Sequence, residues 1–177
     1  MKAHYQSCLD KHGATPQGVN WKDDEAQYMR FRALARLFDA GTVNDWGCGY
    51  GAFYKFCGAG YTGYDIVPQT LERGRFVLSD HPTEIADYTV ASGLFNVRLG
   101  TPREEWGAYV RRSIRTMFKM SRKGFGFNVL STWCNHKDPS LYYASPLDML
   151  AEAATYSRRV ELNHTYSPYD FTVLVTL

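Results

Sequence analysis

The sequence lacks the features that mark several large classes of protein. Its longest apolar runs, such as FTVLVTL at residues 171–177, have the length of a strand and are too short to span a bilayer. Residues 1–10 contain one lysine and no apolar stretch, so we expect no secretory signal. The 20 basic and 18 acidic residues form no long block of one sign and leave a net charge of +2. We therefore expect neither a nucleic-acid partner nor a membrane partner.

Cysteine pairs at metal-site or redox spacing are also missing. The four cysteines lie at positions 8, 48, 57 and 134 without a Cys-x-x-Cys pair. This pattern indicates reduced thiols and a cytoplasmic protein. Cys134 and His136 would supply only half of a metal site, so no metal is expected. With 177 residues, the chain is long enough for one domain and too short for two. We expect residues 1–40 to form a helical lid or extension on a core of residues 41–177.

Helical and strand patterns alternate along most of the chain. Helical periodicity predicts helices over residues 23–38, 102–120 and 145–156, with shorter ones beginning in AFYKFC (52–57) and at Pro68 in PQTLERGR (68–75). Strands are predicted at 42–46, 60–66, 75–78, 88–92, 124–130, 158–163 and 171–177, and the last two are close enough to pair antiparallel. The pattern predicts an α/β fold, a three-layer sandwich around a mostly parallel sheet.

The stretch NDWGCGYGAFY, residues 44–54, places three glycines directly after the first predicted strand. Ligands of open α/β sheets bind at the carboxyl ends of the strands, where the strand order reverses. Asp65 ends the next strand, in position to accept hydrogen bonds from the two ribose hydroxyls of an adenosine. Read as Gly47, Gly49 and Ala52, the same stretch also satisfies the loose pattern for NAD, which stays open as an alternative. Asp45 favours S-adenosylmethionine, because a carboxylate here would repel a pyrophosphate but attract an ammonium and a sulfonium.

Four stretches together resemble the class I S-adenosylmethionine-dependent methyltransferases. DWGCGYG (45–51) is similar to the first motif of that family, and GYDI (63–66) to the second. LSD (78–80) resembles the third motif, and YTVASGLFN (88–96) the fourth. The stretches HGATPQGVNW, ASGLFNV and YSPYDFTVLV are similar to small bacterial members of unknown acceptor. The resemblance implies a Rossmann-like methyltransferase fold with seven strands in the order 3-2-1-4-5-7-6, the last strand antiparallel.

The resemblance also implies a cofactor, S-adenosyl-L-methionine, and residues that hold it. An acidic side chain after the third strand meets adenine in this family, which here is Asp80. Only seven residues separate Asp80 from Tyr88, too few for a full crossover helix, so we expect a loop or a single turn there. Arg30 is predicted to pair with the carboxylate of the cofactor. The complete set of predicted cofactor-binding residues is Trp21, Arg30, Asp45, Gly47, Cys48, Gly49, Asp65, Ile66, Asp80, Ser92 and Gly93.

A small-molecule acceptor is expected, and an oxygen or a nitrogen is favoured over a carbon as the atom that accepts the methyl group. The chain has neither the Asn/Asp-Pro-Pro-Tyr-like box of amino-methyltransferases acting on DNA bases nor the Pro-Cys pair of cytosine-C5 enzymes. Polar aromatic side chains in the predicted loops suit a small-molecule pocket. Predicted acceptor-binding residues are Tyr5, Phe95, Asn96, Trp133, Tyr142 and Tyr166. His136 and His164 are the candidates for a general base.

Two other functions remain compatible with the sequence. One is an NAD-type oxidoreductase, and the other is a non-catalytic module that binds a cofactor or serves as a scaffold. The state of assembly is predicted to be a monomer or a homodimer.

Overall fold

The computed structural model describes residues 1–57 and 60–177. Its helices are α1 (Lys2–His12), the short 3-10 helix η1 (Gln17–Val19), α2 (Asp24–Ala35), α3 (Tyr54–Cys57), α4 (Arg103–Lys119) and α5 (Pro146–Ala154). Its strands are β1 (Val43–Trp46), β2 (Tyr61–Asp65), β3 (Arg75–Leu78), β4 (Ala86–Ala91), β5 (Ser121–Ser131), β6 (Tyr143–Ala144), β7 (Arg159–Asn163) and β8 (Asp170–Thr176). Within the described residues, no helix combines the length and the apolar character needed to cross a membrane.

The strands form one sheet in the order β3-β2-β1-β4-β5-β8-β7. Pairs among β1 to β5 are parallel, whereas β8 runs antiparallel to both β5 and β7. The predicted order and the antiparallel last strand are confirmed. The two-residue strand β6 pairs with the end of β5 and makes eight strands where seven were expected.

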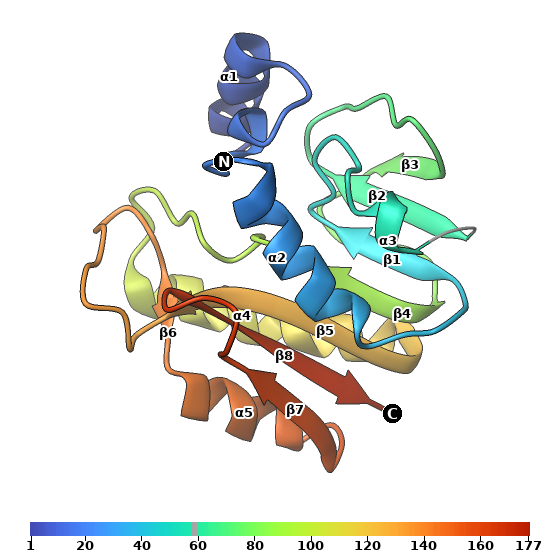
Figure 1. Ribbon diagram of the computed structural model, residues 1–177, viewed down its shortest axis with the longest axis vertical. Coiled ribbons are helices and arrows are strands. Elements are labelled where there is room, and N and C mark those ends of the chain that lie inside the picture. The colour runs from blue at the N-terminus through green and yellow to red at the C-terminus, as the bar shows by residue number, and fades with distance from the viewer. Residues whose placement is uncertain (58–59) are drawn as a thin grey trace.

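Helices cover both faces of the sheet, which confirms the three layers (Figure 1). On one face, α4 and α5 pack on the sheet through Val110, Ile114, Met117, Met149 and Ala153, all buried. On the other face, α2 contributes Phe31 and Leu34, and Phe53 packs beside them just before α3. Helix α1 lies apart from both layers and buries none of its residues completely.

Two connections between strands test what sequence periodicity predicted outside the sheet. The helix predicted from Pro68 is wrong, because the segment between β2 and β3 consists of bends and irregular chain. Leu71 in this segment points back to the glycine turn, so that a Cβ on Gly51 would lie 2.8 Å from its Cδ2. The prediction of no full crossover helix between Asp80 and Tyr88 is confirmed.

Candidate functional site

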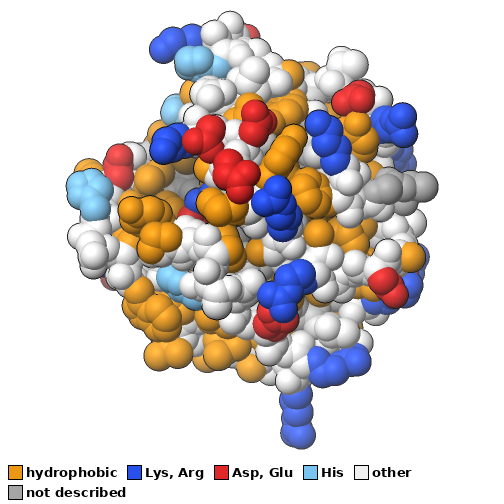
Figure 2. All heavy atoms as spheres, viewed as in Figure 1, with side chains coloured by type: hydrophobic (Ala, Val, Ile, Leu, Met, Phe, Trp, Pro, Cys, Tyr) orange, Lys and Arg blue, Asp and Glu red, His pale blue; other side chains and the backbone are white. Residues whose placement is uncertain are grey.

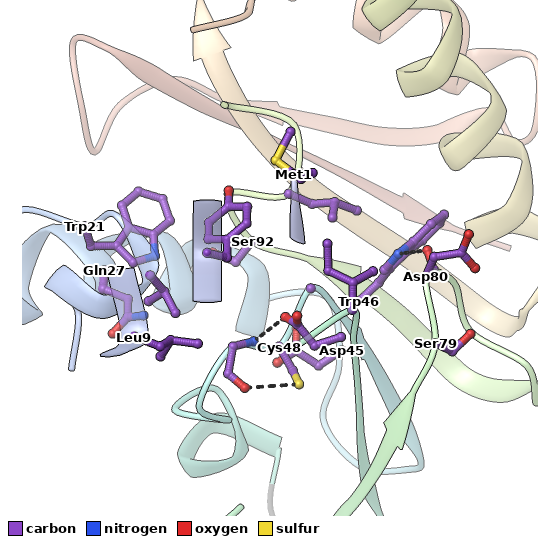
Figure 3. A pocket seen from close by; sticks show the side chains of 18 of the residues that line it. Met1, Leu9, Trp21, Gln27, Asp45, Trp46, Cys48, Ser79, Asp80 and Ser92 are labelled. Atoms are coloured by element: carbon purple, nitrogen blue, oxygen red, sulfur yellow. Dashed lines mark hydrogen bonds between the residues drawn. The ribbon is translucent and has the colours of Figure 1, made fainter. Parts of the chain in front are cut away.

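A cavity of about 310 Å³ opens at the carboxyl ends of β1, β2 and β4, beneath α1. This volume falls within the range of small-molecule sites, roughly 300–1,000 Å³. Figure 3 shows the cavity extending from Trp21 and Gln27 at one end to Ser79 and Asp80 at the other, with Asp45 and Cys48 between them. Of the predicted cofactor-binding residues, ten line it: Trp21, Asp45, Gly47, Cys48, Gly49, Asp65, Ile66, Asp80, Ser92 and Gly93.

The glycine turn after β1 has a backbone that other residues rarely adopt. Gly47, Gly49 and Gly51 have φ angles of 77°, 52° and 82°. A Cβ on Gly49 would lie 2.8 Å from Cγ1 of Val19, which comes from η1. The turn therefore needs glycine both for its left-handed conformation and for the close approach of η1.

Asp65 joins the end of β2 to the glycine turn. Its Oδ2 accepts a hydrogen bond from the Gly49 amide at 2.9 Å, and its Oδ1 accepts one from the Val67 amide at 2.9 Å. Burial raises the pKa of this carboxyl, and the two amides oppose that rise. Since a carboxylate oxygen can accept two hydrogen bonds, each oxygen retains the capacity to accept one from a ligand hydroxyl.

Asp45 is a buried carboxyl group in the wall of the cavity. Only 2% of the residue is exposed, and its Oδ2 accepts a hydrogen bond from the Tyr61 hydroxyl at 2.6 Å. Burial raises its pKa to about 7, opposed by the Tyr61 hydrogen bond and reinforced by the charge of Asp65. This carboxyl consequently gains or loses its proton near neutral pH.

The loop after β4 is held by a buried amide on the neighbouring strand. Asn128 of β5 accepts a hydrogen bond from the Gly93 amide at 2.8 Å and donates one to Ser92 Oγ at 3.2 Å. Asn128 is fully buried. Both ends of its side chain thus fix the loop that closes one wall of the cavity.

Helix α1 covers the cavity with residues that the sequence analysis did not assign to a cofactor. Met1, Tyr5 and Leu9, four residues apart, line it. Asn20 links α1 to the chain after η1, because its side chain contacts His4 Nε2 at 2.8 Å and accepts a bond from Cys8 Sγ at 3.3 Å. The i, i+4, i+8 spacing was the sequence signal for this face. The other unassigned lining residues are Val19, Gln27, Phe31, Trp46, Ser79, Leu94, Trp106 and Tyr109.

Asp80 borders the cavity mainly with its backbone, and its carboxylate is largely exposed. Its carbonyl oxygen accepts a hydrogen bond from Trp46 Nε1 at 2.8 Å (Figure 3). The carboxylate is 80% exposed and lies 2.6 Å from His81 Nδ1. The position predicted for an adenine contact is at the cavity, but the carboxylate points largely to solvent.

A second space, a groove of about 680 Å³, shares Trp21 with the cavity. Its wall is formed by the start of α2, the segment 96–99, Ser140 and Leu141, and the segment 166–169. Figure 2 shows a hollow on this face, rimmed by hydrophobic, acidic and basic side chains. Asn96 lines the groove, and its buried Oδ1 has no hydrogen-bond partner among the described residues.

The predicted acceptor-binding residues separate into three places. Asn96 and Tyr166 line the groove, and Tyr5 lines the cavity. Phe95 and Tyr142 belong to the core instead, packed with α4. Trp133 is 58% exposed and stacks on His164 with ring centroids 5.3 Å apart. Only half of the predicted set therefore faces a space that a ligand could occupy.

Three predicted polar residues have partners that the sequence did not indicate. Arg30 pairs with Asp170 at the start of β8 and lines the groove rather than the cavity. His164 lies between Trp133 and Phe171, and it lines neither the cavity nor the groove. His136 is exposed, and its carbonyl oxygen accepts a bond from Cys134 Sγ. The geometry does not bring either histidine to the cavity as a base.

Comparison with known proteins agrees with the geometry of the cavity. No family model matches the chain. "Putative methyltransferase Rv1506c" of Mycobacterium tuberculosis is 36% identical over 160 residues, which cover 80% of this chain and 96% of that protein.

Solved structures share the fold. The N-methyltransferase NodS from Bradyrhizobium japonicum WM9, in complex with S-adenosyl-L-homocysteine, matches with a TM-score of 0.63 and 12% identity over 99% of this chain and 97% of that one. The Burkholderia thailandensis 1,6-didemethyltoxoflavin-N1-methyltransferase matches with a TM-score of 0.60 and 18% identity over 99% and 89%. The sequence relative decides the family, and the solved structures share its fold. The chain belongs to the class I S-adenosylmethionine-dependent methyltransferases.

Proposed function

We propose that this chain holds S-adenosylmethionine in the cavity under α1 and transfers its methyl group to a small molecule bound in the adjoining groove. The observation that carries the proposal is the pair of spaces that share Trp21. One is lined by the glycine turn and two carboxyl groups, and the other largely by apolar and aromatic side chains. Two adjoining sites, one for the donor and one for the acceptor, are the arrangement that a two-substrate transfer requires.

The residues of the cavity fit the cofactor from one end to the other. Asp65 has the capacity to accept bonds from the ribose hydroxyls, and Ile66 and Ser79 line the part where adenine would lie. Asp45 would face the ammonium group, because opposite charges in a buried site attract strongly. Ser92 and Gly93, near Trp21, would lie beside the sulfonium.

The groove favours an acceptor that is neutral or positively charged. Its walls are largely apolar or aromatic, with Met29, Val97, Leu99, Leu130, Leu141, Pro168, Tyr166 and Tyr169. The charge of Arg30 is compensated by Asp170, and Lys22 at the rim is matched by Asp23 and Glu25. The unpartnered Asn96 amide is available to orient a polar group of the acceptor. The Burkholderia relative, whose bound ligand is 1,6-didemethyltoxoflavin, supports a ligand of small size.

When bound, the cofactor would supply a methyl group for in-line displacement, in which the acceptor forms a bond to the methyl carbon as the carbon–sulfur bond breaks. The chain's own task is to hold the acceptor on that axis and to exclude water. Met1, which precedes α1, and Tyr5 and Leu9 of α1 would close the cavity as a lid. Burial raises the pKa of Tyr5 above its usual range, so its phenol stays protonated and can donate but not act as a base. We assign no general base, and an acceptor that attacks through a neutral nitrogen lone pair requires none during attack.

We also propose a cellular compartment and a state of assembly for the protein. The four cysteines are unpaired, as expected for a cytoplasmic protein. A monomer or a homodimer without nucleic-acid or membrane partners fits the balanced charge of +2.

Calorimetry with S-adenosylhomocysteine tests the donor site directly. We expect S-adenosylhomocysteine to bind with micromolar affinity, and Asp65→Ala to weaken that binding. Absence of binding by the wild-type chain would contradict the proposal. Turnover is then measured with methyl-labelled S-adenosylmethionine and a pool of neutral and cationic ring compounds. Cofactor binding without transfer to any member of the pool would favour the non-catalytic module over the enzyme.

A further inference from the structure

Arg30 is a buried cation that lines the groove and has a partner on each of its three guanidinium nitrogens. Its Nε donates to Asp170 Oδ1 at 3.0 Å, Nη2 donates to Asp170 Oδ2, and Nη1 donates to the Ala26 carbonyl oxygen. Asp170 is fully buried, lies 140 residues away in the sequence and also accepts from Ser167 Oγ at 3.3 Å. The edge of the guanidinium that could hold a cofactor carboxylate is therefore already occupied by a carboxylate of the chain.

The flat face of the same guanidinium supports Trp21. Arg30 Cζ lies 4.4 Å from the centroid of the Trp21 ring, a distance typical of a cation–π contact. Because a bidentate ion pair fixes the plane of the guanidinium, it also fixes the surface on which the indole rests. Asp170 thus acts on Trp21 through Arg30.

The indole is confined at its edge as well. A Cβ built on Gly93, whose φ is 73°, would lie 2.5 Å from Trp21 Cζ2. Gly93 is in turn held by Asn128. Trp21 therefore sits between the guanidinium of Arg30 and the backbone of the loop after β4.

This confined ring forms part of the wall of both spaces. Trp21 is common to the cavity and the groove, and Figure 3 shows it at the end of the cavity opposite Asp80. An acceptor in the groove beside Trp21 would therefore lie next to the indole that also borders the cavity. The position of the ring consequently limits the direction from which the acceptor approaches.

We propose that Arg30 and Asp170 are positioning residues that fix the Trp21 indole as the partition between the cofactor cavity and the acceptor groove. Arg30 acts through Trp21 and not through the carboxylate of the cofactor. This inference rests on the proposed function for the roles of the two spaces. The contacts of Arg30 with Asp170 and with Trp21, which we call the clamp, are instead a property of the free protein. Lysine cannot replace Arg30 here, because an ammonium has no flat face to support an indole.

Fluorine NMR of the protein labelled with 5-fluorotryptophan tests the clamp. The chain has four tryptophans, so Trp21→Phe identifies the Trp21 signal by its loss. Arg30→Lys keeps a cation beside Asp170 but removes the flat face. We expect it to shift or broaden the Trp21 signal while those of Trp46, Trp106 and Trp133 stay in place. The matched control is Arg32→Lys on the same helix, where the side chain is exposed and pairs with Glu25.

Ligand binding separates this role from direct contact with the cofactor. We expect Arg30→Lys to change the affinity for S-adenosylhomocysteine by less than about threefold, since the clamp makes no bond to it. A Trp21 signal identical to wild type in Arg30→Lys would overturn the clamp. So would a tenfold loss of S-adenosylhomocysteine affinity with unchanged affinity for 5′-methylthioadenosine, which lacks the carboxylate, because Arg30 would then bind that group.

A second variant keeps the test decisive if Arg30→Lys unfolds, which would move all four signals. The double change Arg30→Gln with Asp170→Asn removes both buried charges together and so avoids leaving one unpaired. It must perturb the Trp21 signal alone, and an unperturbed signal refutes the clamp. Absence of S-adenosylhomocysteine binding by the wild-type chain would instead count against the proposed function, and the NMR result on the free protein would still decide the clamp.

Discussion

Cofactor binding should release a proton from Asp45, and the size of the effect follows from its burial. The pKa of this carboxyl is raised to about 7 by burial, against an ordinary value of 3.8. An ammonium group placed beside it would lower that pKa again, because an opposite charge stabilises the ionised form. In the free protein, Asp45 is about nine-tenths protonated at pH 6 and about one-quarter protonated at pH 7.5. Binding must ionise the protonated fraction.

The expected change in affinity can be worked out from these fractions. Ionising Asp45 weakens the apparent affinity by about 11-fold at pH 6 and by about 1.3-fold at pH 7.5, if the bound carboxyl is fully ionised. S-adenosylhomocysteine should therefore bind about eightfold more tightly at pH 7.5 than at pH 6, a difference of about 1.2 kcal/mol. At pH 6, about 0.9 protons should be released for each ligand bound.

Calorimetry in two buffers with different enthalpies of ionisation measures both quantities. The control ligand is 5′-methylthioadenosine, which carries adenosine but no ammonium and should show neither effect. It also cancels any contribution from His81, which lies beside Asp80 at the other end of the cavity. Equal affinities of S-adenosylhomocysteine at the two pH values, with no proton released, would refute the argument that Asp45 faces the ammonium.

The same raised pKa has a consequence for stability with the opposite dependence on pH. Between about pH 4 and pH 7 the unfolded chain has lost the Asp45 proton while the folded chain retains it, so the contribution of Asp45 to stability falls as the pH rises. Above pH 7 both states are ionised and the contribution is constant. The variant Asp45→Asn should lack this slope in thermal unfolding, and it should also lose the pH dependence of S-adenosylhomocysteine binding.

Three further changes test other parts of the cavity. Asp65→Ala should weaken both S-adenosylhomocysteine and 5′-methylthioadenosine by about 1–3 kcal/mol in calorimetry, because the ribose bonds are common to both ligands; an effect on only one of them would contradict the ribose assignment. Tyr61→Phe should raise the pKa of Asp45 further by removing its hydrogen bond, which the midpoint of the binding pH profile would report as a shift to higher pH. Asn128→Leu should lower the free energy of unfolding by about 1–3 kcal/mol, because the Gly93 amide loses its partner, and denaturant titration with a wild-type midpoint would contradict this role.

Much of the fold and most of the donor site could be predicted because their signals are local. The glycines at 47, 49 and 51 and the carboxyl group at Asp65 lie at strand ends, and parallel strands bring their carboxyl ends to one edge. The segment after Pro68 forms bends instead of the predicted helix, and its Leu71 lies against the glycine turn, a contact that local periodicity does not report. The spacing of Tyr5 and Leu9 marks one face of α1, but it does not say which surface that face covers.

The sequence by itself indicated the glycine turn and the part of the sheet where the site lies, and its resemblance to a known family implied the cofactor and the order of the strands. Those features depend on the conformational freedom of glycine and on side chains a few residues from a strand end. Only the tertiary structure decided the partner of Arg30, the place of Trp21 between two spaces and the distance of both histidines from the cavity. Arg30 and Asp170 lie 140 residues apart, and a sequence pattern carries no information on which distant carboxylate a buried cation will find. Burial then makes that pairing obligatory, because an unpaired charge in the interior is too costly to keep.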